Sequence, residues 1–494
     1  MSHLLFLKKK QIENSILLKK YKLHYNKEKR ELFFMNANKK RDFIVITVAS
    51  LATFYGAYMG NVTPVALPKM AEIFGLSNIM QNWVTNIFLL TMGVLAIPLG
   101  KLCSRYGVKK TFIYSVILML IGSIGTPLSH TIPELLIFRV IQGIGGAGLC
   151  VDSMLIIAEA IRPEKRGQAL GITVSCTYIG IALAPVLGGS LTYNFGWESI
   201  FWVMIPFILL NLILLFTIKE EWFKYQNEKF DLKGSLVFAI GILLLIYGFS
   251  IFNTAIGFII TVAGVFLLIL FGKIELNSKY PAYDIKLYKN KKFLSSNIAS
   301  ILSYIATFVV TTIVNYNFQY VRGFDSQLSG LILITFPLLM AIVAPAAGKL
   351  SDRIDPQKIA TIGMIIVTVG LILLVPLDKD TSIVIVLVSL ALQGIGYGLF
   401  ASPNINTIMS SVPPKDTPMA SSAVATMRIL GQTLSTGILT VIFAIMMGNV
   451  IIQPSNYPQL ISCSQITLLI ITIISALCFI VCHMGYKSKD KLYF

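Results

Sequence analysis

Charged residues are scarce in this sequence. Asp, Glu, Lys and Arg together make up 13% of its 494 residues, whereas a soluble globular protein carries about 25%. Hydrophobic residues account for 55% of the chain. This balance leaves no room for a large soluble domain and indicates a helical protein that crosses the membrane many times.

Histidine and clustered cysteine are also lacking. The four histidines, none of which neighbours a nucleophile or an acid pair, are His3, His24, His130 and His483. The six cysteines form no CxxC and no Cys/His cluster, so we expect neither a disulfide framework nor a metal site. Without a catalytic constellation, we expect no enzyme activity and no cofactor.

The nucleotide-binding motif GxxxxGK[ST] is absent too, so uphill transport would need an ion gradient. Acidic residues are few: 23 Asp and Glu stand against 41 Lys and Arg, which gives a net charge of +18. In a soluble chain this excess would suggest nucleic acid. In a membrane protein it is better explained by basic cytoplasmic loops. We therefore expect a lipid bilayer around the chain and no nucleic acid partner.

Long apolar runs, by contrast, are plentiful. Fourteen stretches can cross a bilayer as helices, and they cover residues 43–64, 82–100, 111–129, 134–158, 168–192, 198–218, 234–251, 255–272, 293–319, 329–348, 358–377, 381–405, 419–447 and 464–484. If the N-terminus lies inside, the only Lys and Arg residues of the exterior loops are Lys69, Arg322 and Lys379. The only ones within the spans are Arg139 and Arg428. The positive-inside rule therefore predicts a multi-pass plasma-membrane protein with both termini in the cytosol.

Three matches indicate that the chain contains a duplicated half. Gly100–Lys110 matches Gly348–Lys358, Gln142–Gly145 matches Gln393–Gly396, and Pro163–Ala169 aligns with Pro414–Ala420. The second copy follows about 250 residues after the first, as in transporters whose halves face each other across a midplane site. Both GKL loops should lie inside, where cysteines at Val108 and Gln357 would be protected from outside reagents. We predict an all-α membrane protein of two six-helix bundles.

The predicted domains follow from this repeat. Residues 43–218 form the N-terminal bundle and residues 293–484 the C-terminal bundle, while residues 219–292 hold an inserted helix hairpin with interior loops. The hairpin has no charge within its spans, so we expect it to lie beside the transport path. Alanine at Ser250 or Asn253 should then leave transport near wild type.

The two ends of the chain are expected to lie in the cytosol. Residues 1–42 are basic and contain no long apolar run, which predicts poor order. Two interpretations stay open: Met35 is the true start and residues 1–34 lie upstream of it, or the segment binds anionic lipid. Residues 485–494 form the second cytosolic tail.

The stretch Glu134–Glu159 combines small residues with two charges. Its glycines would let another helix approach closely. Arg139 and Asp152 lie within it, and charges at membrane depth seldom face lipid, so both are candidate functional residues. Gln142 and Gly143 share the face of Arg139, which favours burial of this side chain against a helix over snorkelling to the surface.

Asp152 is a candidate proton carrier. It is the only carboxylate well inside a predicted span. Arg139 lies about 220° away around the helix, so a direct ion pair between them is not expected. Asp152 shares its face with Gly145 and Gly148, and burial without a cation favours a carboxyl that keeps its proton near neutral pH. The alternative is a protonated Asp152 that only hydrogen-bonds a neighbouring helix.

Several ordered motifs resemble the major facilitator superfamily, and within it the fourteen-helix drug:proton antiporters. The loop motif G-x-L-x-D-R-x-G-R-K is matched at Gly100, Leu102, Arg105, Gly107, Lys109 and Lys110, and its second copy keeps Gly348, Asp352 and Arg353. The fourth-helix motif R-x-x-Q-G is matched at Arg139, Gln142 and Gly143. The fifth-helix antiporter motif G-x-x-x-G-P-x-x-G-G is matched at Gly180, Pro185, Gly188 and Gly189, with Ala184 for one glycine.

The resemblance implies roles for these residues. It implies that the two loop motifs act as conformational switches. Asp352 either caps an interior helix in one conformation or is an ordinary solvated acid. Pro185 interrupts the backbone hydrogen bonds, either for coupling or as a packing kink. The chain departs from the family at Met59 and Ser104, where the family has acids.

Four polar residues are candidates for a central cavity, namely Asn86, Gln142, Asn315 and Arg428. Amides within membrane helices more often link helices than bind ligands, so both interpretations stay open. Arg428 is closer to the predicted inner surface than Arg139 is. This position favours snorkelling of the Arg428 side chain to the membrane surface. The aromatic residues single out no substrate stack.

These features predict export of small amphipathic compounds, of the multidrug kind, in exchange for protons by alternating access. The substrate would bind near the midplane, between the two halves. One alternative is a facilitator or symporter for a metabolite, which the missing acids at Met59 and Ser104 favour. Another is a membrane sensor or assembly protein that has the fold without transport.

Overall fold

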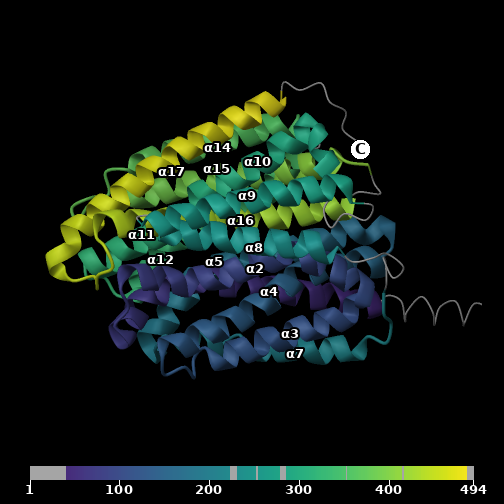
Figure 1. Cartoon of the computed structure of the whole chain (residues 1–494), viewed down its shortest axis with the longest axis horizontal. Helices are drawn as coiled ribbons and strands as arrows, with labels where there is room; N and C mark the ends of the chain where they lie inside the picture. The colour runs from purple at the N-terminus through teal and green to yellow at the C-terminus, as the bar shows by residue number, and fades with distance from the viewer. Residues whose placement is uncertain are drawn as a thin grey trace, which may run out of the picture.

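The computed structural model describes residues 40–222, 231–251, 254–278, 285–351, 353–413 and 417–486. Within these ranges every regular element is a helix. Most of the helices run side by side along the long axis of the molecule (Figure 1). The predicted all-α fold is therefore confirmed.

Some predictions fall on residues outside these ranges. Almost all of the basic segment 1–42, including Met35, is not described, and neither is most of the C-terminal tail. Asn253 and Asp352 also lie outside the described residues, as does the side chain of Ser250. The expectations for these positions stay predictions.

The first half of the chain forms one group of helices. It consists of a first helix (Lys40–Phe74), α2 (Asn78–Tyr106), α3 (Val108–Gly125), α4 (Ile132–Ala160), α5 (Pro163–Phe195), α6 (Ser199–Trp202) and α7 (Ile205–Thr217). A hairpin follows, made of α8 (Leu232–Ser250) and α9 (Ala255–Asn277), and then the short η1 (Ile285–Lys289).

The second half forms the other group. It consists of α10 (Lys291–Thr307), α11 (Val310–Tyr316), η2 (Asn317–Val321), α12 (Ser326–Leu333), α13 (Thr335–Ser351), α14 (Pro356–Leu374), α15 (Ile383–Ser410), α16 (Thr417–Met446), η4 (Pro454–Asn456) and α17 (Tyr457–Tyr486).

Among the described residues, twelve helices are long and apolar enough to cross a membrane. Helices α2 and α8 are not among these twelve, and the apolar part of α8, Lys233–Gly248, is short. A helix is present at each of the fourteen predicted positions. Membrane crossing by α2 and α8 stays a prediction.

The predicted span boundaries are wrong at several places. The first helix runs to Phe74, ten residues past the predicted end. The added residues include polar side chains and a proline and are helical all the same. The predicted spans 293–319 and 329–348 each lie within one candidate membrane segment, Lys291–Val321 and Ser326–Ser351, with a short turn between α10 and α11 and at Ile334 between α12 and α13. Helix α9 continues to Asn277, so Glu275 is a second buried carboxylate within a helix. Apolar runs mark the hydrocarbon thickness, not the ends of the helices.

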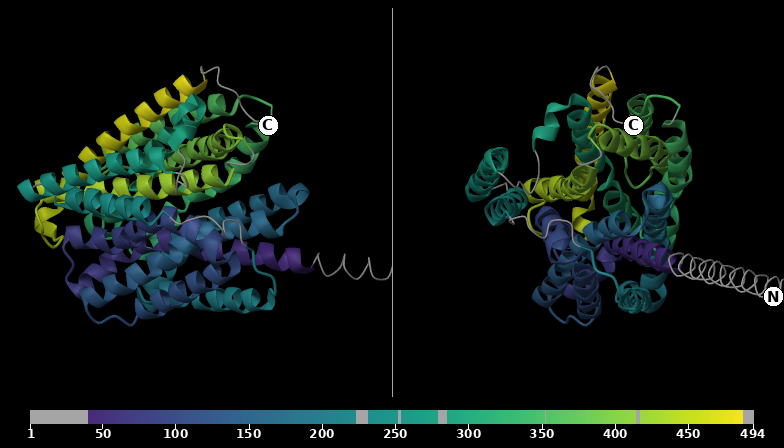
Figure 2. Two further views of the ribbon diagram at one scale, coloured as in Figure 1. Left: turned by 45° about the vertical axis from the view of Figure 1, so that its right-hand side comes forward. Right: turned by 90° about the vertical axis from the view of Figure 1, so that its right-hand side faces the viewer.

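The two groups of helices pack separately and then against each other. Helix α4 packs against α2 and α3, and α7 covers α3; in the other half α15 packs against α13 and α14, and α17 against α10 and α14. The groups meet where α2 packs on α16, and where α5 packs on α12 and α13. Helix α8 contacts α2 and α16, which places the α8–α9 hairpin at the edge of the molecule (Figure 2).

Candidate functional site

The small residues of α4 place it between two other helices. A Cβ atom at Gly143 would lie 2.8 Å from the carbonyl oxygen of Phe88 in α2. A Cβ atom at Gly145, on another face, would lie 2.5 Å from the backbone nitrogen of Met119 in α3. Only glycine permits these contacts, so α4 can present one charged residue to α2 and another to α3.

Arg139 is fully buried against α2. Its Nε donates to the carbonyl oxygen of Val84 (3.1 Å) and its Nη1 to Oε1 of Gln142 (2.6 Å). Its guanidinium carbon lies 4.6 Å from the ring centroid of Phe88, close enough for a cation–π interaction. Nη2 has no hydrogen-bond partner. Arg139 is therefore held by neutral groups, and no carboxylate among the described residues pairs with it.

Gln142 links Arg139 to two further helices. Its Nε2 donates to Oγ of Ser123 (2.9 Å) in α3 and lies 3.5 Å from Sδ of Met59 in the first helix. Met59 stands where the resembled family has an acid, so a thioether faces the Arg139–Gln142 pair in place of a counter-ion. Gln142 is fully buried, and its observed role is to join helices.

Asp152 is fully buried between α4 and α3. Its Oδ1 accepts a hydrogen bond from the Thr111 hydroxyl and its Oδ2 accepts one from the Ser115 hydroxyl, both at 2.9 Å. A Cβ atom at Gly148 would collide with Ser115 Oγ, so the glycine makes room for this contact. The structure does not bring Asp152 and Arg139 together.

The start of α3 is capped by a residue that sequence reasoning missed. The carboxylate of Glu221 accepts hydrogen bonds from the backbone N–H groups of Lys109 (2.7 Å) and Lys110 (3.0 Å), which satisfies and neutralises the helix N-terminus. Gly107 has φ of 109°, and a Cβ there would lie 2.7 Å from Glu221 Cδ. The available signal was an acidic pair directly after span 198–218, on the same side of the membrane.

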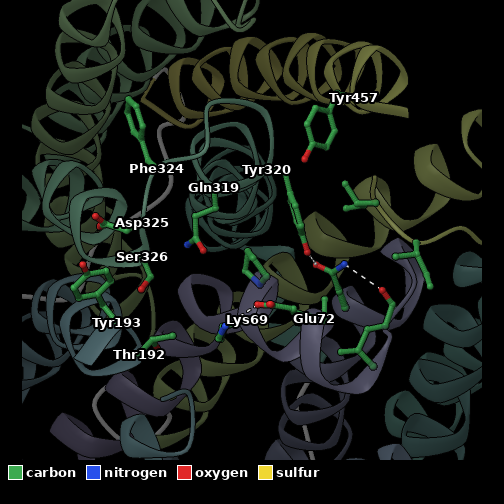
Figure 3. A pocket seen from close by; sticks show the side chains of 16 residues that line it. Lys69, Glu72, Thr192, Tyr193, Gln319, Tyr320, Phe324, Asp325, Ser326 and Tyr457 are labelled. Carbon is green, nitrogen blue, oxygen red and sulfur yellow. Dashed lines mark hydrogen bonds and ion pairs between the residues drawn. The ribbon is translucent and has the colours of Figure 1, made fainter. Parts of the chain in front are cut away.

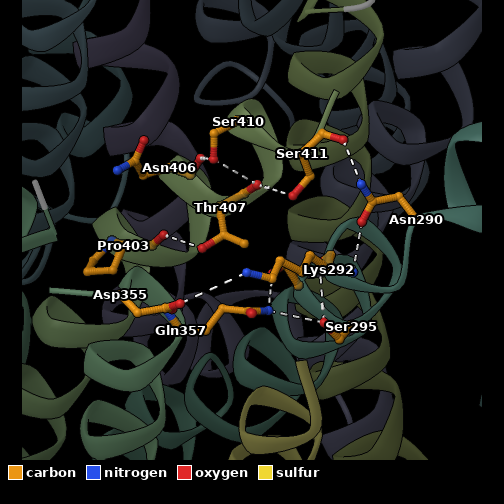
Figure 4. A network of polar contacts seen from close by, with 11 residues as sticks. Asn290, Lys292, Ser295, Asp355, Gln357, Pro403, Asn406, Thr407, Ser410 and Ser411 are labelled. Atoms are coloured by element: carbon orange, nitrogen blue, oxygen red, sulfur yellow. Dashed lines mark hydrogen bonds and ion pairs between the residues drawn. The ribbon is translucent and has the colours of Figure 1, made fainter. Parts of the chain in front are cut away.

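The second loop motif leads into a polar network that sequence reasoning also missed. Asp355 caps α14 by accepting a hydrogen bond from the backbone N–H of Gln357 (2.9 Å). Nζ of Lys292, in α10, lies 3.9 Å from Oδ2 of Asp355. The Gln357 side chain donates to Oγ of Ser295 and of Ser296, both at 3.2 Å (Figure 4). An Asp-Pro pair before an apolar run was the signal for this cap.

The remaining loop-motif residues show little contact with one another. The guanidinium carbon of Arg105 lies 5.8 Å from the ring centroid of Tyr106. Arg353 is exposed, and a Cβ atom at Gly348 would lie 2.8 Å from Ser402 Oγ in α15. The surroundings of Gly100 and the side chain of Ser104 are outside the described part of the chain. A switching role for these loops stays a prediction.

The motif of α5 brings the two groups of helices together at one end. We call the end with loops 75–77, 196–198, 322–325 and 447–456 the outer end, because the charge distribution predicts that it faces outside, and the opposite end the inner end. Cβ atoms at Gly189 and at Gly330 would collide with the backbone of Ser326 and of Pro185. Helices α5 and α12 therefore touch backbone to backbone.

The rest of the α5 motif packs on the first helix. A Cβ atom at Gly180 would collide with the carbonyl oxygen of Phe54, and one at Gly188 would lie 2.7 Å from Val62 Cγ2. The motif thus joins α5 to the first helix within its own group and to α12 of the other group.

Further hydrogen bonds join the two groups at the outer end. Pro68 has no N–H, which leaves the carbonyl of Pro64 without its helical donor. The side chain of Asn315 donates to that carbonyl (2.8 Å), and Gln319 donates to the carbonyl of Val65 (2.9 Å). Asn315 is fully buried. In this structure it links the two groups, and a role in a central cavity stays a prediction.

A recess of about 670 Å³ lies at this end between the two groups. It is lined by residues that include Lys69, Glu72, Gln319, Tyr320 and Tyr457 (Figure 3). Lys69 and Glu72 form an ion pair at 2.7 Å. The hydrogen bonds from Gln319 to the carbonyl of Val65 and from Tyr320 to Gln81 join the two groups of helices at the wall of this recess.

Arg428 lies on α16, in the half of this helix nearer the inner end. Its Nη2 lies 3.1 Å from Sγ of Cys150 in α4, so the contact crosses the boundary between the two groups. The phenol groups of Tyr178, Tyr304 and Tyr397 lie close enough to interact electrostatically with the guanidinium of Arg428. Sequence reasoning named Arg428 but not these tyrosines, because they come from three helices far apart in the chain.

Asn86 shares one face of α2 with Gly93, seven residues on, and Gly93 contacts Ile429 of α16. Asn86 is buried, and neither its Oδ1 nor its Nδ2 has a hydrogen-bond partner. It is thus the one candidate among the predicted amides whose hydrogen-bonding groups are all without a partner in the described part of the chain.

The described residues contain no group of three or more His, Cys, Asp or Glu side chains that could hold a metal ion.

Two groups of membrane helices that pack against each other, with buried charged residues between the helices, are the arrangement found in many secondary membrane transporters. A family model of the Major Facilitator Superfamily matches residues 48–280 and 297–491. The chain belongs to the Major Facilitator Superfamily.

Curated relatives include transporters for different compounds. The riboflavin transporter RibZ of Clostridioides difficile is 27% identical over 407 residues, which cover 82% of this chain and 89% of that protein. The multidrug resistance protein Stp of Mycobacterium tuberculosis is 29% identical over 407 residues, which cover 80% of this chain and 75% of that protein.

Solved structures share the fold at low sequence identity. A bacterial homologue of the human lysosomal transporter Spinster, in an inward-facing conformation, has a TM-score of 0.64 at 17% identity, and the match covers 90% of this chain and 98% of that one. A D-xylose–proton symporter has a TM-score of 0.59 at 15% identity, and the match covers 87% of this chain and 97% of that one. At these identities the likeness concerns the fold alone.

Proposed function

We propose that this protein exports small amphipathic compounds in exchange for protons, by alternating access, as the fourteen-helix drug:proton antiporters do. The observation that carries the proposal is the buried carboxyl of Asp152, which accepts hydrogen bonds from two hydroxyl groups and forms no ion pair with a cation of the described residues. Burial without a neighbouring cation favours the neutral form of a carboxyl, so such a group can bind and release a proton during a transport cycle.

The hydroxyl groups around Asp152 suit both of its protonation states. When the carboxylate is charged, Thr111 and Ser115 donate to it. The Thr111 hydroxyl also lies 2.9 Å from the carbonyl oxygen of Gly107, and that of Ser115 lies 2.9 Å from the carbonyl oxygen of Thr111. When Asp152 is protonated, either hydroxyl can donate to the carbonyl of its own helix and accept a hydrogen bond from the carboxyl O–H of Asp152. Proton uptake then needs no rearrangement of α3 against α4.

The outer-end contacts support alternating access. They consist of a few hydrogen bonds and glycine contacts between α5, α12, the first helix and α11. Such discrete contacts can separate as one unit, which would open the outer end while the inner end closes. In this cycle substrate leaves outward and protons move inward through a plasma membrane, with both termini in the cytosol.

A second candidate function is facilitated or proton-symported movement of a metabolite. The observation that favours it is Met59, which lies beside the Arg139–Gln142 pair in place of an acid. The relatedness to a riboflavin transporter is in line with this alternative, as the relatedness to a multidrug resistance protein is with efflux.

The substitution Asp152→Asn tests the proposal. Asparagine keeps the shape and can still hydrogen-bond to Thr111 and Ser115 but does not titrate. We expect this variant to lose gradient-driven efflux of a fluorescent dye from everted vesicles and to keep dye binding. Asp378→Asn, in an outer loop, is the matched control and should pump normally. Pumping by Asp152→Asn against a gradient would show that Asp152 has only a structural role.

A further inference from the structure

Arg428 is a cation between the two groups of helices that has no acidic partner among the described residues. Its contact with another side chain is to the thiol of Cys150, at 3.1 Å, and a thiol is a weak acceptor. No carboxylate of the described residues pairs with it. The guanidinium carries five N–H donors in a fixed plane, so it can bind a carboxylate, phosphate or sulfonate with two parallel hydrogen bonds.

Aromatic residues from several helices lie near this cation, and Tyr178, Tyr304 and Tyr397 interact with its charge. Tyr304 (α10) and Tyr397 (α15) have ring centroids 5.7 Å apart with their planes at 67°, and Phe336 (α13) lies 6.0 Å from Tyr397. Tyr178 contributes a further phenol from α5. The rings therefore come from both groups of helices, as the walls of a midplane site would.

A polar group of this cluster has no hydrogen-bond partner of ordinary geometry within the described part of the protein. Tyr397 is 4% exposed, yet its hydroxyl has no hydrogen-bond partner of ordinary geometry. Arg428, Tyr304, Tyr178 and Phe336 are partly exposed although they lie between helices. A buried phenol without a partner is costly unless something else satisfies it at some stage of the cycle.

We infer that Arg428 and these aromatic residues form a subsite for flat aromatic compounds that carry a negative charge. The inference rests on the proposed function, because it names the class of compound that the transport site takes. The guanidinium binds the anionic group, and Tyr304, Tyr397 and Phe336 contact the ring faces and edges. Aromatic cations fit this subsite poorly, because they would meet Arg428 without a carboxylate to screen it.

Two dyes with the same ring system and opposite charge test the inference. Fluorescein is an anionic xanthene and rhodamine 123 a cationic one, and fluorescence anisotropy reports the binding of both to the purified full-length protein. We expect fluorescein to bind more tightly. Arg428→Gln should weaken fluorescein binding by about tenfold or more, since hydrogen bonds to charged groups are the strong ones. Arg428→Lys should restore part of it.

Two further variants separate charge from shape. Tyr304→Leu removes a ring and should weaken both dyes, whereas Arg428→Gln should weaken only fluorescein. Arg322→Gln, which removes a cation at the outer end, is the control and should leave both dyes unaffected. Equal fluorescein binding by Arg428→Gln and wild type, or tighter binding of rhodamine 123 than of fluorescein, would overturn the inference.

Vesicle transport distinguishes a failure of this inference from a failure of the proposed function. Arg428-dependent fluorescein binding without proton-driven movement of the dye supports the subsite and contradicts antiport. Proton-driven movement of rhodamine 123 that does not depend on Arg428 supports antiport and contradicts the subsite.

Discussion

At the scale of the single residue, Arg139 shows how a membrane helix can hold a buried charge. Burying an unpaired ion costs several kcal/mol, and here the carbonyl of Val84, the amide of Gln142 and the face of Phe88 offset that cost. Each of these contacts uses a different property of the guanidinium. The Nε–H direction, the Nη1–H direction and the flat face all depend on its planar shape.

Arg139→Lys should therefore destabilise the protein although it keeps the charge. A lysine ammonium cannot donate to Val84 and Gln142 in the same geometry or lie flat on Phe88. The expected loss is about 1–3 kcal/mol, measured as a lower melting temperature of the purified protein. Arg353→Lys, at an exposed position, is the control. An unchanged melting temperature for Arg139→Lys would mean that the charge alone matters.

Residue-level prediction succeeded where neighbours lie on one helix and failed where they do not. The i, i+3 and i+4 spacing of Arg139, Gln142 and Gly143 was enough to predict a shared face toward another helix. The donors of Asp152 lie on α3, and nothing in the sequence of α3 distinguishes Thr111 and Ser115 from other hydroxyl residues that bond their own helix.

At the scale of the element, α4 depends on two glycine faces. Gly143 lets α2 approach and Gly145 lets α3 approach, each against backbone atoms that cannot move aside. The sequence predicted close packing from this run of small residues. It did not predict where helices end, because caps such as Glu221 and Asp355 and breaks such as Ile334 depend on groups outside the apolar run.

Gly145→Ala should be clearly destabilising. The added Cβ would lie 2.5 Å from Met119 N and 2.7 Å from Ser115 O, so α3 must shift, at a cost of about 1–3 kcal/mol. Gly437→Ala, in α16, has no atom within 4 Å of the added Cβ and should be neutral or stabilising by up to about 1 kcal/mol from helix propensity. Melting temperatures of both variants decide between tight packing and a tolerant helix.

At the scale of the whole molecule, the duplicated sequence predicted two groups of helices, and the packing shows two groups that meet across α2 and α16 and across α5 and α12. The central cluster of Arg428 with its tyrosines could not be predicted in this way. Its residues come from α4, α5, α10, α15 and α16 and are far apart in the sequence. No local pattern in the chain therefore indicates that they lie close together.

The orientation of these groups in the membrane rests on the distribution of basic residues and needs its own test. The loop motifs suggested cysteines at Val108 and Gln357, but both side chains are buried. Val108 lies under the segment after α7, to which it donates a backbone hydrogen bond, and Gln357 bonds Ser295 and Ser296. A reagent would not reach either position from any side.

Exposed positions in the same loops give a clean test. Lys110→Cys and Lys358→Cys lie at the inner end, and Lys379→Cys lies at the outer end. With the native cysteines replaced, an impermeant maleimide added to intact cells should label only Lys379→Cys, and permeabilisation should make the other two reactive. The reverse pattern would invert the topology, since one Lys-rich face must be cytosolic. It would also reverse the direction of the proposed cycle, because the end that we call outer would then face the cytosol.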